Sequence, residues 1–163
     1  MNTQAQALEA RMQTASRALS RFVIDKARKV QRQIGFGYVE AADAPNNMRE
    51  LMAAFENSKR TGQPLPVFSG ASEGTIYTSK EANWAFRFWH DVVHCQHDLG
   101  FNFADEVSVA WLQGEAVAAE FGKESMEYRM FMADTAGQSL YAQTHGGEFP
   151  VDQWAYVAAL VAA

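Results

Sequence analysis

The chain has 163 residues, of which 48% are hydrophobic and 20% are charged, and its formal net charge is −5 at pH 7. These values are typical of one globular domain and exclude an intrinsically disordered chain. No apolar run approaches the ~18 residues of a membrane span, and the N-terminus carries charges where an export signal has its apolar stretch. The single cysteine, Cys95, excludes an internal disulfide framework, so we expect a cytoplasmic protein with no membrane partner.

Residues 1–33 predict a long amphipathic helix with a basic face, and its periodic pattern runs over 4–33. The apolar face has residues at helical spacing and offers a surface for a homodimer: Leu8, Met12, Ala15, Leu19, Phe22, Val23 and Val30. Four arginines line the opposite face: Arg17, Arg21, Arg28 and Arg32. A solvated face is the favoured interpretation of these arginines, and binding to nucleic acid or an acidic partner is the alternative.

Charge is unevenly distributed along the chain. Residues 1–33 hold seven Lys or Arg against Glu9 and Asp25, whereas the remaining residues hold seven basic and seventeen acidic groups. A surface this acidic binds nucleic acid poorly because it repels the phosphate backbone. Contact with nucleic acid is therefore expected only through the first helix.

Residues 34–78 predict short strands and one helix. The stretch "IGFGYVEAAD" (34–43) is typical of a short strand, and residues 46–60 predict a helix that ends before Gly62 and Pro64. The runs "PVFSG" and "GTIYT" are rich in β-forming residues and predict a small hairpin or two-stranded sheet. The segment "FSGASEGT" is polar enough to cradle an anion, although a turn between strands is favoured.

Residues 79–145 predict three helices that form the core of a metal site. Ser79 is a good N-cap for the first helix, which we expect to end at Gly100. A second helix is predicted over 103–121 and a third over about 124–144, and residues 146–163 supply a C-terminal helix. The predicted fold is one mainly α domain over 1–163, a multi-helix bundle with a small β-hairpin or short sheet.

The stretch "FWHDVVHCQHDLG" (88–100) holds three of the four histidines of the chain. They share the polar sector of the predicted helix, so an ordinary solvated face is one interpretation. Solvated faces, however, favour Lys, Glu, Gln and Arg, which form helices more readily than histidine does. His90 and His94 are four residues apart, which places both imidazoles on one side of the helix. We therefore favour a metal-binding role for this pair.

A third ligand is expected from a carboxylate on another helix. Asp134 lies in an aromatic stripe, where an ionised carboxylate is costly unless it is paired or bound to a cation. Its alternative role is a buried cap or an ion pair with Arg87. Glu106 is a second candidate ligand, although a first-turn carboxylate is also favoured by the helix dipole. Gln113 and Gln138 fall where they could orient the ligands.

Two histidines with one or two carboxylates suit a divalent ion such as Zn²⁺, Mn²⁺ or Fe²⁺, and the ligand types do not select among them. Cys95 projects from the apolar side, so thiolate ligation is not expected. A zinc peptidase of the H-E-x-x-H type uses Glu as its base where this chain has the shorter Asp91, which argues against a peptidase of that type. No pair of Glu-x-x-His motifs is present, which excludes a ferritin-like di-iron site.

The residues around the histidine pair resemble two known families. The segment "WHDVVH" is similar to the H-D core of HD-type phosphohydrolases, which implies that His90 and Asp91 bind metal and that Asp134 is the later aspartate; the chain lacks that family's earlier histidine. Over about residues 36–157, the order of "FGYVE", "VFSG", "AFRFWHDVVH", "LGFNFADEVSVA" and "ADTAGQSLY" resembles a family of small tailed-bacteriophage proteins. That resemblance implies a phage origin, a location in the host cytoplasm and a shared set of positions: His90, Asp91, His94, Glu106 and Asp134.

Two functions are compatible with these patterns. The first is a metal-dependent hydrolase in which His90, His94 and either Asp134 or Glu106 hold the ion, Asp91 or Glu106 is the base, and a nucleotide or other phosphorylated small molecule is the substrate. The second is a non-enzymatic phage accessory protein that binds and inhibits a host macromolecule through its basic first helix.

Overall fold

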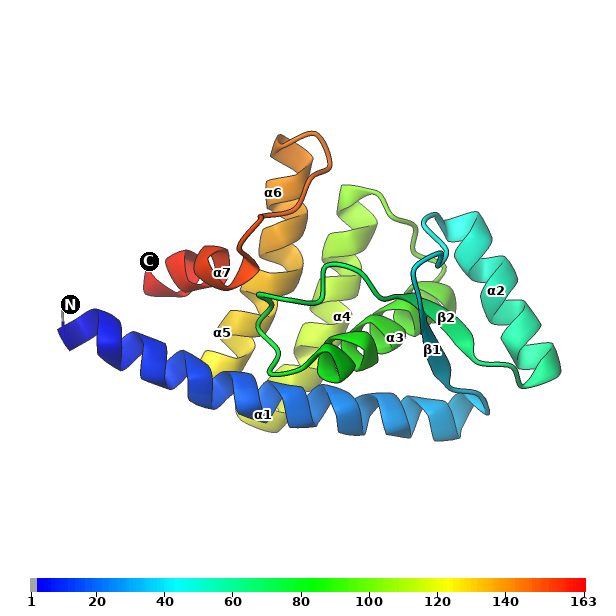
Figure 1. Cartoon of the computed structure of the whole chain (residues 1–163), viewed down its shortest axis with the longest axis horizontal. Helices are drawn as coiled ribbons and strands as arrows, with labels where there is room; N and C mark the ends of the chain where they lie inside the picture. Colours follow the sequence, from blue (N-terminus) through cyan, green and yellow to red (C-terminus); the bar gives the residue numbers. More distant parts are fainter. Residues whose placement is uncertain (1–2) are drawn as a thin grey trace.

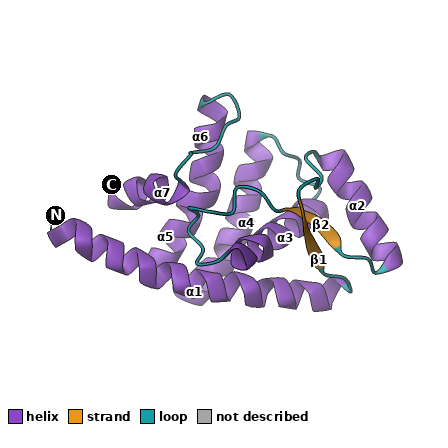
Figure 2. Cartoon of the chain, viewed as in Figure 1, coloured by secondary structure: helices purple, strands orange, loops and turns teal. Residues whose placement is uncertain are grey.

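The computed structural model describes residues 3–163 and is mainly α-helical with one small sheet (Figures 1 and 2). The longest helix, α1 (Thr3–Ile34), runs along one side of the molecule (Figure 1). Against it pack α3 (Lys80–His97) and α5 (Met126–Met132), while α4 (Phe103–Phe121) packs on α3 and α5. The prediction of a mainly α bundle with a short sheet is confirmed.

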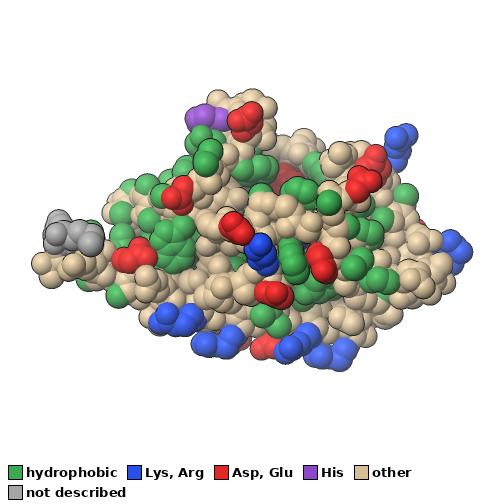
Figure 3. Space-filling model, viewed as in Figure 1, with side chains coloured by type: hydrophobic (Ala, Val, Ile, Leu, Met, Phe, Trp, Pro, Cys, Tyr) green, Lys and Arg blue, Asp and Glu red, His purple; other side chains and the backbone are tan. Residues whose placement is uncertain are grey.

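The apolar face of α1 is used by the core of the protein itself. Met12, Leu19 and Val23 are fully buried, so this face is not free to form a dimer. The four predicted arginines are exposed on the opposite face. Figure 3 shows Lys and Arg side chains gathered along the edge of the molecule that α1 forms. None of the helices that the structure describes has both the length and the apolar character needed to cross a bilayer.

The sheet consists of β1 (Tyr38–Ala41) and β2 (Leu65–Phe68), which pair in parallel with Tyr38 opposite Leu65. Helix α2 (Met48–Thr61) makes the crossover between them. The alternative of a β-hairpin between "PVFSG" and "GTIYT" was therefore wrong. Residues 74–78 form bends, because the Ser16 hydroxyl donates to the Ile76 carbonyl and the Ser20 hydroxyl accepts from the Thr78 N–H. Side chains of α1 thus supply the partners that a neighbouring strand would have supplied.

The two helices that carry the histidines and Glu106 have well-defined ends. The Ser79 side chain accepts from the N–H of Ala82 at the start of α3, which confirms the predicted N-cap. The helix ends at His97, earlier than Gly100, because Asp98 takes a left-handed conformation and closes the last turn. Asn102 caps α4, which spans the predicted residues.

The predicted third helix contains a local change of pitch. It is formed by α5, a π-helical turn η1 (Ala133–Gly137) and α6 (Gln138–Thr144), which follow one another without a break. A π-turn frees backbone carbonyls from their usual partners. The Tyr156 hydroxyl, from α7 (Gln153–Ala162), donates to the Gly137 carbonyl at 2.8 Å, and the Ser139 hydroxyl donates to the Thr135 carbonyl at 3.1 Å. The bulge is thus held from outside and from within the helix.

Candidate metal centre

Three ligand atoms meet between α3 and α4. The Nε2 atoms of His90 and His94 are 3.0 Å apart, and Oε2 of Glu106 lies 3.3 Å from the first and 3.6 Å from the second. The His94 side chain is fully buried, and those of His90 and Glu106 are 20% and 25% exposed. Among the described residues, this is the one group of His, Cys, Asp and Glu side chains whose spacing suits a metal ion.

The far side of each imidazole is fixed by a protein oxygen. Nδ1 of His94 lies 2.8 Å from the Leu99 carbonyl oxygen, which can only accept, so this nitrogen carries the proton. Nδ1 of His90 lies 2.8 Å from Oε1 of Gln113, a buried side chain of α4. When both rings are neutral, their Nε2 lone pairs therefore face each other and the Glu106 carboxylate. Three electron-rich atoms repel one another unless a proton or a cation lies between them.

The spacing of these atoms fits a metal ion. The circle through three points with these separations has a radius of about 1.9 Å, close to the ~2.0–2.2 Å at which zinc binds histidine nitrogen and carboxylate oxygen. One ion can therefore reach all three atoms without a change in the backbone. The donor set, two histidines and one glutamate, occurs in catalytic zinc sites and also in non-haem iron sites.

The three groups also shift one another's protonation. Burial opposes a charge on His90, but the hydrogen bond and the negative charge of Glu106 outweigh burial and raise the pKa of His90 above 6.5. Burial alone would raise the pKa of Glu106, yet the hydrogen bonds of His90 and His94 lower it from 4.5 to about 2. Glu106 is therefore a carboxylate over the whole physiological range, as a metal ligand must be.

Asp91 and Asp134 line the same cavity as the three ligand residues but lie outside the ligand group. Burial raises the pKa of Asp91 to about 6, against the opposing charges of His90 and His94. Burial also raises the pKa of Asp134 to about 7, although Gln138 donates a 2.6 Å hydrogen bond to its Oδ1. Both carboxyl groups thus titrate near neutrality, which suits proton transfer.

Arg87 does not form the ion pair with Asp134 that the sequence left open. Its guanidinium donates to the carbonyl oxygen of Phe68, the last residue of β2, and to those of Gly70 and Ala71 in the loop that follows. It also lies 3.4 Å from the Ser72 hydroxyl. No Arg87–Asp134 pair within 4.0 Å occurs among the described residues. Because the loop directs its carbonyls toward a cation, the anion cradle considered for "FSGASEGT" is not supported.

The three ligand side chains line a cavity of about 390 Å³. Its wall combines polar side chains, including Asn83 and Gln153, with aromatic ones at the rim: Phe68, Phe101 and Phe149. This volume is within the range of small-molecule sites.

No family model, curated protein or solved structure matches the chain. The function of the centre is therefore inferred from its own geometry and chemistry.

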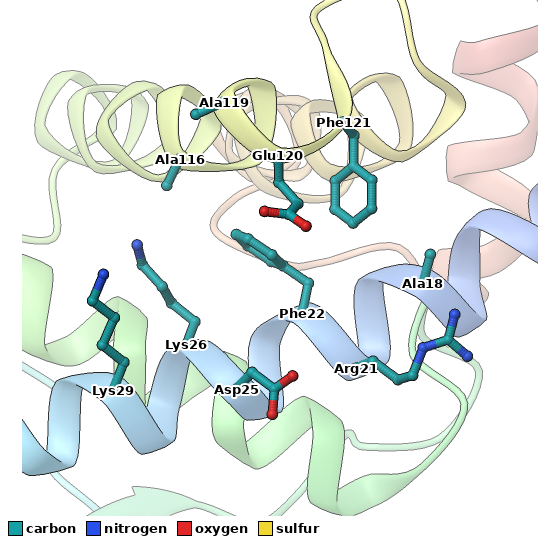
Figure 4. Close-up of a pocket in the computed structure, with 10 residues that line it drawn as sticks. All are labelled: Ala18, Arg21, Phe22, Asp25, Lys26, Lys29, Ala116, Ala119, Glu120 and Phe121. Atoms are coloured by element: carbon teal, nitrogen blue, oxygen red, sulfur yellow. The ribbon is translucent and has the colours of Figure 1, made fainter.

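A second hollow, of about 620 Å³, lies between α1 and α4 (Figure 4). Its basic side chains, Arg21, Lys26 and Lys29, come from α1, and its acidic side chains are Asp25 of the same helix and Glu120 of α4, so no strong field of one sign results. The ammonium group of Lys26 also forms a cation–π contact, since it lies 5.3 Å from the centre of the Trp89 ring. This groove lacks the convergent ligands of the centre beside α3.

Most of the residues at the centre were predicted from the sequence. The structure brings His90 and His94 together with Glu106, one of the two carboxylates considered as the third ligand, and leaves Asp134 outside the group. Gln113 contacts His90, the kind of contact expected for it. Gln138 instead contacts Asp134. The contact of His94 with the Leu99 carbonyl was not predicted, because any residue type can supply a backbone carbonyl and the sequence therefore does not mark it. Two neighbours stay outside the ligand group: His97 is exposed, and the Cys95 thiol is buried, which raises its pKa to about 12.

Proposed function

We propose that this protein is a metal-dependent hydrolase whose divalent ion is held by His90, His94 and Glu106. The observation that carries the proposal is the convergence of two Nε2 lone pairs and one carboxylate oxygen on a common point. Nδ1 of each ring is already turned to a carbonyl oxygen. Three protein ligands leave a coordination position free, which is typical of catalytic sites rather than structural ones.

The residues around the ligands have distinct roles in this proposal. A bound divalent ion lowers the pKa of water and polarises the bond to be hydrolysed. Since Glu106 is used as a ligand, the base is Asp91, which lines the cavity next to His90 and has a pKa near 6. Asp134, with its pKa near 7, is the group that supplies a proton to the leaving atom. Gln138 keeps that carboxyl group in place through its hydrogen bond.

Metal analysis tests the binding step directly. Protein purified without a histidine tag is expected to hold close to one equivalent of a divalent metal after exposure to zinc, manganese or iron salts. His94→Ala is expected to lose that metal, because it removes the buried ligand. His97→Ala is the matched control, since His97 is an exposed histidine of the same helix outside the ligand group. Equal metal content in the wild type and His94→Ala would overturn the proposal.

A second candidate function is supported by the exposed arginines of α1. Arg17, Arg21, Arg28 and Arg32 are all exposed on one helix, while the rest of the chain is acidic. Such a row suits an acidic host macromolecule, as expected for a phage accessory protein. Charge reversal at all four positions, compared with His94→Ala in a capture experiment from host lysate, separates the two functions. A partner that is lost only on charge reversal favours the accessory role.

A further inference from the structure

Two hollows meet at one of the metal ligands. The cavity that contains His90 and His94 shares part of its wall with a neighbouring hollow of about 430 Å³. Both are lined by Phe101, Glu106, Ser139 and Phe149. The Glu106 carboxylate therefore stands between two spaces and not at the end of one. A ligand that reaches the metal can extend to both sides of it.

The rim of these hollows is apolar and uncovered. The Phe68, Phe101 and Phe149 side chains are 47%, 37% and 59% exposed, and all three line the cavity of the metal centre. Exposed aromatic rings that border a concave site are a typical feature of ligand binding, because a ligand that covers them gains about 25 cal/mol for each Å² of apolar surface buried. The rim thus favours a ligand with apolar groups.

The charges of the cavity do not favour an anionic ligand. Arg87 is the one Lys or Arg side chain in the described wall, and its guanidinium is directed to three backbone carbonyls. Asp91, Asp134 and Glu106 stand on the same wall. A phosphate group would therefore depend on the metal alone, near several carboxyl groups, and would lack the bidentate arginine contacts that phosphate sites use.

We infer that the substrate is an uncharged carbonyl compound with apolar groups on both sides of the bond that is cleaved, such as a short N-acylated peptide amide. This inference rests on the proposed hydrolase function and departs from the phosphorylated substrate implied by the HD-type resemblance. In the reaction, the oxygen of water adds to the carbonyl carbon and the C–N bond breaks. One proton of that water reaches the leaving nitrogen through the cavity carboxyl groups, and the products are a carboxylic acid and an amine.

Binding to cobalt-loaded protein gives a test that does not require turnover. The visible spectrum of the bound cobalt reports titration with acetohydroxamate and with N-benzyloxycarbonyl-phenylalanine hydroxamate, which share a metal-binding group and differ in apolar bulk. We expect the aromatic compound to bind at least tenfold more tightly. Phe101→Ala and Phe149→Ala are expected to reduce that ratio severalfold, while Trp111→Ala, an exposed aromatic residue outside both hollows, leaves it unchanged. Equal affinities, or a ratio unaffected by the rim variants, would overturn the inference.

Turnover distinguishes the carbonyl class from the phosphate class. Metal-loaded protein is assayed with N-benzyloxycarbonyl-Phe-Leu amide, by amine release, and with phenyl phosphate, by phosphate release. We expect kcat/KM to be at least tenfold higher for the amide. A preference for phenyl phosphate would overturn the substrate class while leaving the hydrolase proposal intact. Failure of cobalt or zinc to bind at all would instead remove the proposed function itself.

Discussion

Nδ1 of His94 lies 2.8 Å from the carbonyl oxygen of Leu99, a residue beyond the end of α3. The turn that ends the helix therefore fixes which nitrogen of the ring is free, before any metal arrives. Because Nδ1 is used in this contact, Nε2 is the ring nitrogen that remains available to a metal ion. At any imidazole nitrogen that binds metal, a proton competes with the ion.

Metal affinity is expected to depend on pH because of this competition. Glu106 raises the pKa of His90 above 6.5, and a protonated ring cannot bind metal. Below that pKa, affinity should fall about tenfold for each pH unit, and above it affinity should level off. Calorimetric zinc titrations between pH 5.5 and 8.5 measure this dependence. An affinity that is constant from pH 5.5 upward would contradict it.

Gln113→Leu is expected to weaken metal binding without unfolding the protein. The substitution removes the oxygen that accepts from Nδ1 of His90 and so frees that ring to take the other tautomer. Partners of this kind typically contribute about 10–100-fold in metal affinity. Competition with a chelating dye measures the loss. Gln138→Leu is the matched control, because that amide contacts Asp134 and no histidine; an equal loss in both variants would contradict the orienting role of Gln113.

Asp134→Asn is expected to stabilise the metal-free protein at neutral pH. Burial raises the pKa of Asp134 from 3.8 to about 7, so the folded state binds more protons than the unfolded state between these values. The wild type therefore loses stability as pH rises through this window, whereas the amide does not titrate. The gain should be below about 1 kcal/mol at pH 4 and on the order of 4 kcal/mol at pH 8, since each pKa unit corresponds to about 1.4 kcal/mol.

Urea unfolding in the presence of a chelator, at pH 4 and at pH 8, measures this difference. Asp43→Asn is a suitable control, because Asp43 is exposed and lies outside the cavity. A stabilisation of Asp134→Asn that is equal at the two pH values would show that ionisation of the buried carboxyl group is not its cause.

Arg87→Lys is expected to loosen the loop that follows β2. The planar guanidinium reaches three carbonyls at once, whereas an ammonium group cannot reproduce that fork. Hydrogen exchange of residues 69–78 should become faster, with a loss of about 1–3 kcal/mol in stability. Metal content should be unchanged, since Arg87 is not in the ligand group. Unaltered exchange in the loop would mean that Arg87 does not hold it.

The sequence was most informative where one side chain decides the local structure. Helical spacing of apolar residues located α1, and the capping serine located the start of α3. The four-residue spacing of His90 and His94 placed both rings on one side of the helix. These features depend on neighbours within one or two turns, so they are readable without the fold.

The sequence was less informative where the partner lies far along the chain. Ile76 and Tyr77 are typical strand residues and are buried, yet serines of α1 bind the backbone beside them. The partly buried position of Asp134 was expected from its aromatic neighbours, but its distance from the ligand group depends on how α5 and η1 pack against α4. The π-turn was not predicted, because the one extra residue that it holds shifts the apolar spacing by only a single position.

The π-turn at Ala133–Gly137 holds one residue more than an α-helix would use for the same arc, because its hydrogen bonds join residues five apart instead of four. Deleting one residue within the turn would therefore restore a regular helix and leave the residues after it, including Ser139 in the cavity wall, in nearly the same orientation. Deleting one residue from α6 would instead rotate everything after it by about 100°. Loss of a single codon is therefore expected to be tolerated better within the π-turn than in the regular helix beside it.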